Sequence, residues 1–107
     1  MSEWLYLAIA IIFEVAGTTA MKVSDGFSKL LPSIAMSIFY ILSLAALTYA
    51  LKKIDMSMAY AIWAGVGTAL ITTIGIVVFK EEVSLLKIVS VILIIAGVVG
   101  LHLANRG

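Results

Sequence analysis

Four long apolar segments, separated by short polar breaks, constrain the fold of this chain more than any other feature. Helices are expected over residues 4–21, 33–51, 57–79 and 84–104. A bilayer core about 30 Å thick needs roughly 20 apolar residues per helix, so four spans use nearly all of the 107 residues. Charged residues make up only 12% of the chain, against about 25% in soluble domains. The sequence predicts an all-α integral membrane protein with a single four-helix domain over residues 1–107.

The breaks between the spans are short, so neighbouring helices are expected to run antiparallel with both termini on one side. Three basic residues then lie on the side of the termini and four on the other side: Lys52, Lys53 and Arg106 against Lys22, Lys29, Lys80 and Lys87. The positive-inside rule therefore gives little orientation bias. Either the balance is accidental, or the chain inserts in both orientations. In the second case, two opposed copies can pair as an antiparallel dimer.

Residues at the predicted helix ends agree with this arrangement. Pro32 lies where the second helix should begin, a position at which its missing N–H costs least. Trp4, Tyr6 and Tyr49 also lie near predicted ends, as expected for the aromatic belt at a membrane interface.

Glu14 is the most informative single residue, because it lies about midway along the first span while every other acidic residue is near a helix end or in a loop. A charge at the bilayer centre costs about 2.5 to 3.5 kcal/mol or more, so such groups usually face a cavity or a partner. None of the apolar segments contains a Lys or Arg in its interior to pair with it. Desolvation favours the protonated carboxyl, which is expected to hold a proton and release it when a cation arrives. The alternative is a permanently protonated group that holds helices together.

Helical periodicity places small and polar residues on the face of the first span that carries Glu14. Ala10 and Gly17 leave volume beside the carboxylate, and Thr18 offers a hydroxyl one turn away. Small residues also allow helices in lipid to approach closely, so packing is a competing explanation for Gly17.

Aromatic residues on two other spans are candidates for binding a cation. Tyr60 and Trp63 share a face of the third span, and Tyr40 and Ser43 share a face of the second. Cation–π attraction is worth about 2 kcal/mol or more when desolvated. Taken singly, each ring is better explained by packing than by ligand binding; the combination with an unpaired carboxylate favours a binding site.

Small residues in the third and fourth spans indicate positions of close approach. Gly65 and Gly67 predict either a hinge or tight helix packing. On the fourth span, a seam with a small-residue notch predicts the contact between subunits of a dimer. The seam consists of Ser90, Ile94, Gly97 and Leu101.

The chain lacks the residues that several classes of function require. The chain has no Cys, no metal-ligand cluster and no phosphate-binding glycine loop, so neither an enzyme, a metal site nor a cofactor is expected. A basic patch for nucleic acid is also missing. The expected partners are the lipid bilayer, an organic cation as substrate and a second subunit.

Three sequence segments resemble the small multidrug resistance transporters: residues 13–22 (FEVAGTTAMK), residues 24–27 with 32–33 (SDGF and PS), and residues 59–67 (AYAIWAGVG). The resemblance covers essentially the whole chain. It implies an antiparallel dimer in the bacterial plasma (inner) membrane, driven by the proton gradient, in which protons and cationic substrates compete for Glu14. It also implies pocket roles for Ala10, Gly17, Thr18, Tyr60 and Trp63.

The same resemblance distinguishes two branches of exporters. Gly17 and Tyr40 resemble the branch that exports quaternary ammonium and polyaromatic cations, whereas guanidinium exporters tend to carry a tryptophan just after the glutamate–valine pair. Asp55 and Ala64 depart from the proline and serine of many members. Residues 54–57 (IDMS) resemble members that work as heterodimers of two related chains, so a homodimer and a heterodimer both stay open.

The predicted function is therefore proton-coupled export of lipophilic, quaternary ammonium or polyaromatic cations. One alternative is a guanidinium exporter of the same family. Alternatives of a different class are a proton or cation channel and a non-transporting partner subunit, and Glu14 argues against the latter because a scaffold gains nothing from a carboxylate in the membrane.

Overall fold

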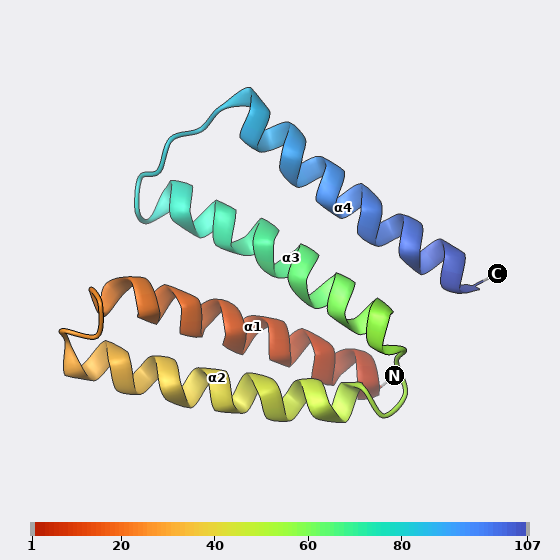
Figure 1. Cartoon of the computed structure of the whole chain (residues 1–107), viewed down its shortest axis with the longest axis horizontal. Helices are drawn as coiled ribbons and strands as arrows, with labels where there is room; N and C mark the ends of the chain where they lie inside the picture. The colour runs from red at the N-terminus through yellow and green to blue at the C-terminus, as the bar shows by residue number, and fades with distance from the viewer. Residues whose placement is uncertain (1, 107) are drawn as a thin grey trace. The chain divides into compact units, whose positions relative to one another are not determined.

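The computed structural model describes residues 2–106 and the side chains of residues 2–104. It contains four α-helices: α1 (Ser2–Val23), α2 (Leu30–Ala50), α3 (Met56–Val77) and α4 (Leu85–Arg106). Figure 1 shows α1 and α2 as one helical hairpin and α3 and α4 as another. All four helices are long and apolar enough to cross a membrane. The predicted fold class, an all-α protein with four spans, is confirmed.

Contacts divide the chain into two compact units, Met1–Ile54 and Asp55–Gly107. The first unit is the α1–α2 hairpin and the second is the α3–α4 hairpin. Each hairpin is antiparallel because its connection is too short to carry the chain back across the membrane. The expectation that all four helices form a single domain stays a prediction.

The helices begin and end within a few residues of the predicted positions. α2 differs most at its start, because it begins at Leu30, after Lys29 in an extended conformation, whereas the prediction began it at residue 33. Pro32 is therefore the third residue of α2. The first four N–H groups of a helix have no intrahelical partner, so proline is tolerated there for the reason the sequence indicated.

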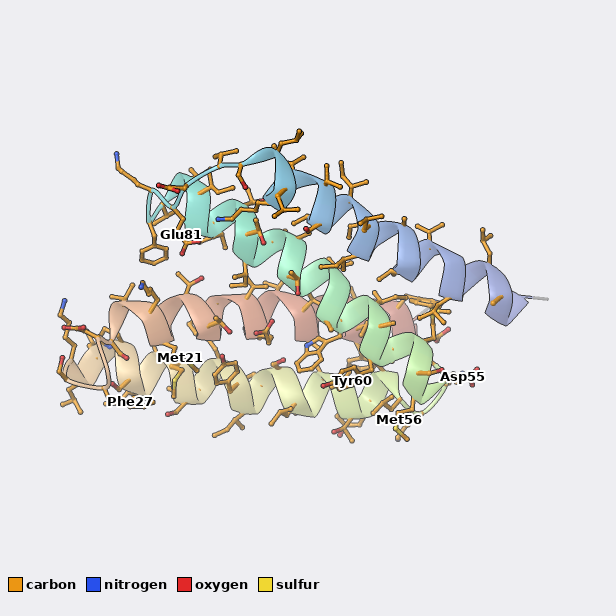
Figure 2. All side chains as sticks on the ribbon, turned by 45° about the horizontal axis from the view of Figure 1, so that its top comes forward. Met21, Phe27, Asp55, Met56, Tyr60 and Glu81 are labelled. Atoms are coloured by element: carbon orange, nitrogen blue, oxygen red, sulfur yellow. The ribbon has the colours of Figure 1, made fainter. Side chains whose placement is uncertain are left out.

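The turn between α1 and α2 is built by Ser24 and three residues with positive φ. The Ser24 hydroxyl donates to the carbonyl of Met21 at 2.7 Å and accepts the N–H of Phe27 at 3.2 Å. Asp25, Gly26 and Phe27 have φ angles of 51°, 70° and 67°, a region in which glycine carries no steric penalty. Met21 and Phe27 consequently lie at the same end of the hairpin (Figure 2).

The connection between α3 and α4 is held against the end of α3. The Glu81 N–H donates to the carbonyl of Gly75 at 3.0 Å, and a Cβ placed on Gly75 would lie 2.6 Å from Glu81 Oε1. Lys87 Nζ donates to the Glu82 carbonyl at 2.8 Å and lies 3.9 Å from Glu81 Oε1. Because Gly75 has no side chain, the Glu81 carboxylate can fold back onto α3 (Figure 2).

Candidate functional site

Glu14 lies at the start of a hydrogen-bonded chain that links α1 to α2. Thr18 Oγ1 donates to Glu14 Oε2 at 2.7 Å, and the same oxygen lies 2.6 Å from the Tyr40 hydroxyl. Glu14 and Thr18 are four residues apart on α1, where helical neighbours share a face. All three side chains are partly exposed. The structure thus joins three of the predicted site residues, one of which belongs to a different helix.

The protonation state of Glu14 determines the direction of this hydrogen-bonded chain. An ionised carboxylate only accepts hydrogen bonds, so Thr18 must donate its single proton to Glu14 and Tyr40 must donate to Thr18. A protonated Glu14 can instead donate to Thr18, which then donates to Tyr40. The Tyr40 hydroxyl on α2 thus has to donate in the arrangement with an ionised carboxylate and can accept in the arrangement with a neutral one.

Ser43 links α2 to the backbone of α1 one turn before Glu14 in the sequence. Its hydroxyl donates to the carbonyl of Ala10 at 2.7 Å and is buried. In an α-helix this carbonyl also accepts the N–H of Glu14, so Ser43 helps to hold the backbone that carries the carboxylate. Ala10 itself has no exposed surface. The predicted contacts of Ser43 and Ala10 with a substrate stay predictions.

Gly17 gives room to the ring of Tyr40. A Cβ placed on Gly17 would lie 3.1 Å from Tyr40 Cδ1 and 3.4 Å from Phe39 Cβ. Phe39 also stacks on Phe13, with ring centroids 5.9 Å apart. The sequence analysis did not single out these phenylalanines as site residues, because an isolated aromatic in an apolar span carries no signal beyond packing. This pair of rings is a second side-chain contact between α1 and α2.

The predicted aromatic pair of α3 is formed within one turn of that helix. The rings of Tyr60 and Trp63 meet edge to face, with centroids 5.6 Å apart and planes at 70°. Tyr60 is largely exposed (61%). Among the residues that the structure describes, the buried Trp63 Nε1 has no hydrogen-bond partner. A buried donor without a partner is costly, so this N–H is available to an acceptor outside these residues.

The small residues of α3 and α4 have different environments. A Cβ placed on Gly65 would lie 2.5 Å from Val98 Cγ2 and 3.4 Å from Ile94 Cγ2, so Gly65 permits close approach of α4. Gly67 is buried, and α3 runs without interruption through both glycines. A Cβ on Gly97 would meet nothing within 4 Å. Ser90, Gly97 and Leu101 are exposed, whereas Ile94 also reaches α3. The hinge and the dimer seam stay predictions.

Comparison with known proteins identifies the family. The sequence profile described as "Small Multidrug Resistance protein" matches residues 2–94. The chain belongs to the small multidrug resistance family. A relative from Bacillus subtilis, the uncharacterized membrane protein YvaE, is 55% identical over 97% of this chain and 87% of its own. The quaternary ammonium compound-resistance protein QacH of Staphylococcus saprophyticus is 41% identical over 92% of each chain.

A further relative is the multidrug resistance protein EbrB of Bacillus subtilis, which is 44% identical over 95% of this chain and 87% of its own. These relatives are named for resistance and membrane location, and none of the three is named as an enzyme. Together with the four helices able to cross a bilayer, membership of the small multidrug resistance family makes this chain a multi-pass membrane protein. No cluster of His, Cys, Asp or Glu that could hold a metal ion occurs among the described residues.

Proposed function

We propose that this member of the small multidrug resistance family is a proton-coupled antiporter, which exports lipophilic cations and returns protons through competition for Glu14. The observation that carries the proposal is the environment of Glu14. Its carboxylate lies midway along α1 (Ser2–Val23), and it accepts a hydrogen bond from the hydroxyl group of Thr18 rather than from a basic side chain. A membrane-embedded carboxylate of this kind needs either a proton or an external cation.

Because Glu14 binds either a proton or a cation but not both, binding of one is coupled to release of the other. A proton and an organic cation cannot both neutralise one carboxylate, so arrival of the cation releases the proton. Release also sets the direction of the hydrogen bonds through Thr18 and Tyr40. Occupancy by proton or by cation is thereby distinguished on α2 as well as on α1, because the hydrogen bonds between the same three side chains run in opposite directions.

The aromatic side chains support a lipophilic cation as the substrate. Phe13 and Phe39 stack on each other between α1 and α2, and Tyr60 and Trp63 form an edge-to-face pair on α3. Aromatic faces attract cations and bury apolar groups. The names of QacH and EbrB, which refer to quaternary ammonium compounds and multiple drugs, support the same class of substrate over guanidinium.

The proposal includes an antiparallel dimer in the bacterial inner membrane. Seven basic residues are divided almost evenly between the two predicted sides, which gives weak orientation bias. No residue of α4 between Leu85 and Ala104 is buried, and Gly97 is open to close approach. A second copy, or a related chain in a heterodimer, is the proposed occupant of this face.

Transport by the purified chain tests the function directly. We expect proteoliposomes that contain only this chain to give transient currents with tetraphenylphosphonium and with a quaternary ammonium compound, because each entering cation displaces protons. Guanidinium should give currents at least about tenfold smaller. Solid-supported-membrane recording measures all three under the same pH gradient. If guanidinium is the only cation that gives currents, the protein belongs to the guanidinium-exporting branch. If none of the three cations gives a current, the chain is not a self-sufficient antiporter.

Removal of the Thr18 hydroxyl should weaken cation binding. The change Thr18→Val keeps the shape of the side chain but removes the bonds to Glu14 and Tyr40. A hydrogen bond to a charged group is worth about 1.5–3 kcal/mol, and partial exposure lowers this value, so we expect a loss of tetraphenylphosphonium affinity of about threefold to tenfold. Isothermal titration calorimetry measures it. The matched control is Thr19→Val, since the Thr19 hydroxyl donates to the Val15 carbonyl of its own helix; equal losses in both variants would contradict the assigned role.

A further inference from the structure

A pocket lies at the end of the first hairpin where α1 begins and α2 finishes, away from Glu14. It has a volume of about 240 Å³ and is lined by Ser2, Glu3, Tyr6, Tyr49, Lys52 and Lys53. Ser2 is the first residue of α1, and Tyr49 is one residue before the end of α2. Both helices are long enough to span the bilayer, so their ends lie at the level of the lipid headgroups.

The floor of this interfacial pocket is an ordered aromatic and basic cluster. The rings of Tyr6 and Tyr49 stack with centroids 5.3 Å apart and an interplanar angle of 28°. Lys52 Nζ lies over the Tyr49 ring, 5.2 Å from its centroid. Cation–π attraction holds the ammonium in place without consuming its N–H donors on a stronger acceptor. Ordering the lysine in advance lowers the entropy lost when it binds a ligand.

The charge of the pocket favours an anion. Two lysines against one glutamate leave a net formal charge of +1 among the lining residues, which disfavours a cationic drug and distinguishes this pocket from the site at Glu14. Two lysine ammonium groups, two tyrosine hydroxyls and one serine hydroxyl supply hydrogen-bond donors. This set of donors suits phosphate oxygens.

We propose that the interfacial pocket binds the phosphate headgroup of an anionic phospholipid. Three observations carry this inference: the pocket lies at the bilayer surface, its net charge is positive, and one of its lysines is held over an aromatic ring. Leu5 and Leu51, which adjoin the lining residues Tyr6 and Lys52 in the sequence, are exposed and offer apolar surface to the acyl chains. Basic pockets between the ends of transmembrane helices are a known setting for anionic headgroups.

Native mass spectrometry of the purified chain in detergent micelles, with phosphatidylglycerol or phosphatidylcholine added at equal concentrations, tests the inference. We expect phosphatidylglycerol to bind preferentially. Each lysine near an anionic lipid contributes enough that loss of two should weaken binding by about 10- to 30-fold, so the double variant Lys52→Gln/Lys53→Gln should lose the preference. Tyr49→Leu, which removes the ring beneath Lys52, should lower the affinity severalfold while retaining both charges.

The matched control removes two lysines from the other end of the same hairpin. Lys22→Gln/Lys29→Gln changes the net charge equally, and both residues are exposed, so binding should stay within about twofold of the unaltered chain. Equal losses in the two double variants would reduce the effect to general charge attraction and overturn the proposal. Displacement of the lipid by millimolar inorganic phosphate would also overturn it, in favour of a free-phosphate site. Because the readout is lipid binding, it is independent of whether the chain transports cations.

Discussion

Replacing Glu14 by Gln is expected to abolish proton-coupled cation transport, with at least a 100-fold fall in the rate at limiting substrate. The amide can neither neutralise a bound cation nor carry a proton. An uncompensated charge at the centre of the bilayer costs about 2.5 to 3.5 kcal/mol, which corresponds to a factor of about 100 or more in binding. Uptake of tetraphenylphosphonium into proteoliposomes driven by an imposed proton gradient measures the loss.

Two further variants test whether the loss of transport in Glu14→Gln is specific to this carboxylate. Glu82→Gln makes the same chemical change in an exposed loop and should leave transport within about twofold. Glu14→Asp retains the charge but shortens the side chain by one methylene, which lengthens the 2.7 Å bond to Thr18, so it should transport weakly. Uptake by the Glu14→Gln variant that still follows the proton gradient would refute Glu14 as the coupling group.

Replacing Gly65 by Val is expected to destabilise the α3–α4 hairpin by about 2–3 kcal/mol. A Cβ at this position would lie 2.5 Å from Val98 Cγ2, a methyl group on a β-branched side chain with restricted rotation. Overpacking typically costs about 1–3 kcal/mol, whereas the gain in helix propensity over glycine is below about 1 kcal/mol. Unfolding by sodium dodecyl sulfate in mixed micelles, followed by circular dichroism, measures the difference.

A second substitution, at Val98, tests whether the loss of stability comes from the clash with Val98 or from valine in the helix in general. Val98→Ala removes the opposing methyl groups, so the Gly65→Val/Val98→Ala double variant should recover most of the lost stability. The control is Gly100→Val on α4, because a Cβ at Gly100 would meet nothing within 4 Å. If Gly65→Val is as stable as the unaltered chain, α4 does not pack against Gly65 as described.

The spans and the central carboxylate were predictable because both depend on local properties of the chain. A helix in a bilayer satisfies its backbone groups internally, so length and hydropathy alone identify four spans, and an acidic residue in the middle of one is recognised by its cost. Helix ends were less predictable. α2 begins at Leu30 rather than at residue 33, because a proline in the first turn is compatible with more than one starting residue.

The sequence by itself determined that this chain has four helices able to cross the membrane and that a carboxylate, Glu14, lies midway along the first of them, since both are local features that need no knowledge of neighbouring helices. Which groups contact which was decided only by the tertiary structure. Thr18 was predicted to lie beside Glu14 from helical spacing, but its bond to Tyr40, 22 residues away, and the bond of Ser43 to Ala10 depend on how α1 and α2 pack. Helix pairing in lipid is specified by packing and hydrogen bonds rather than by hydropathy, so an apolar sequence pattern does not encode these contacts.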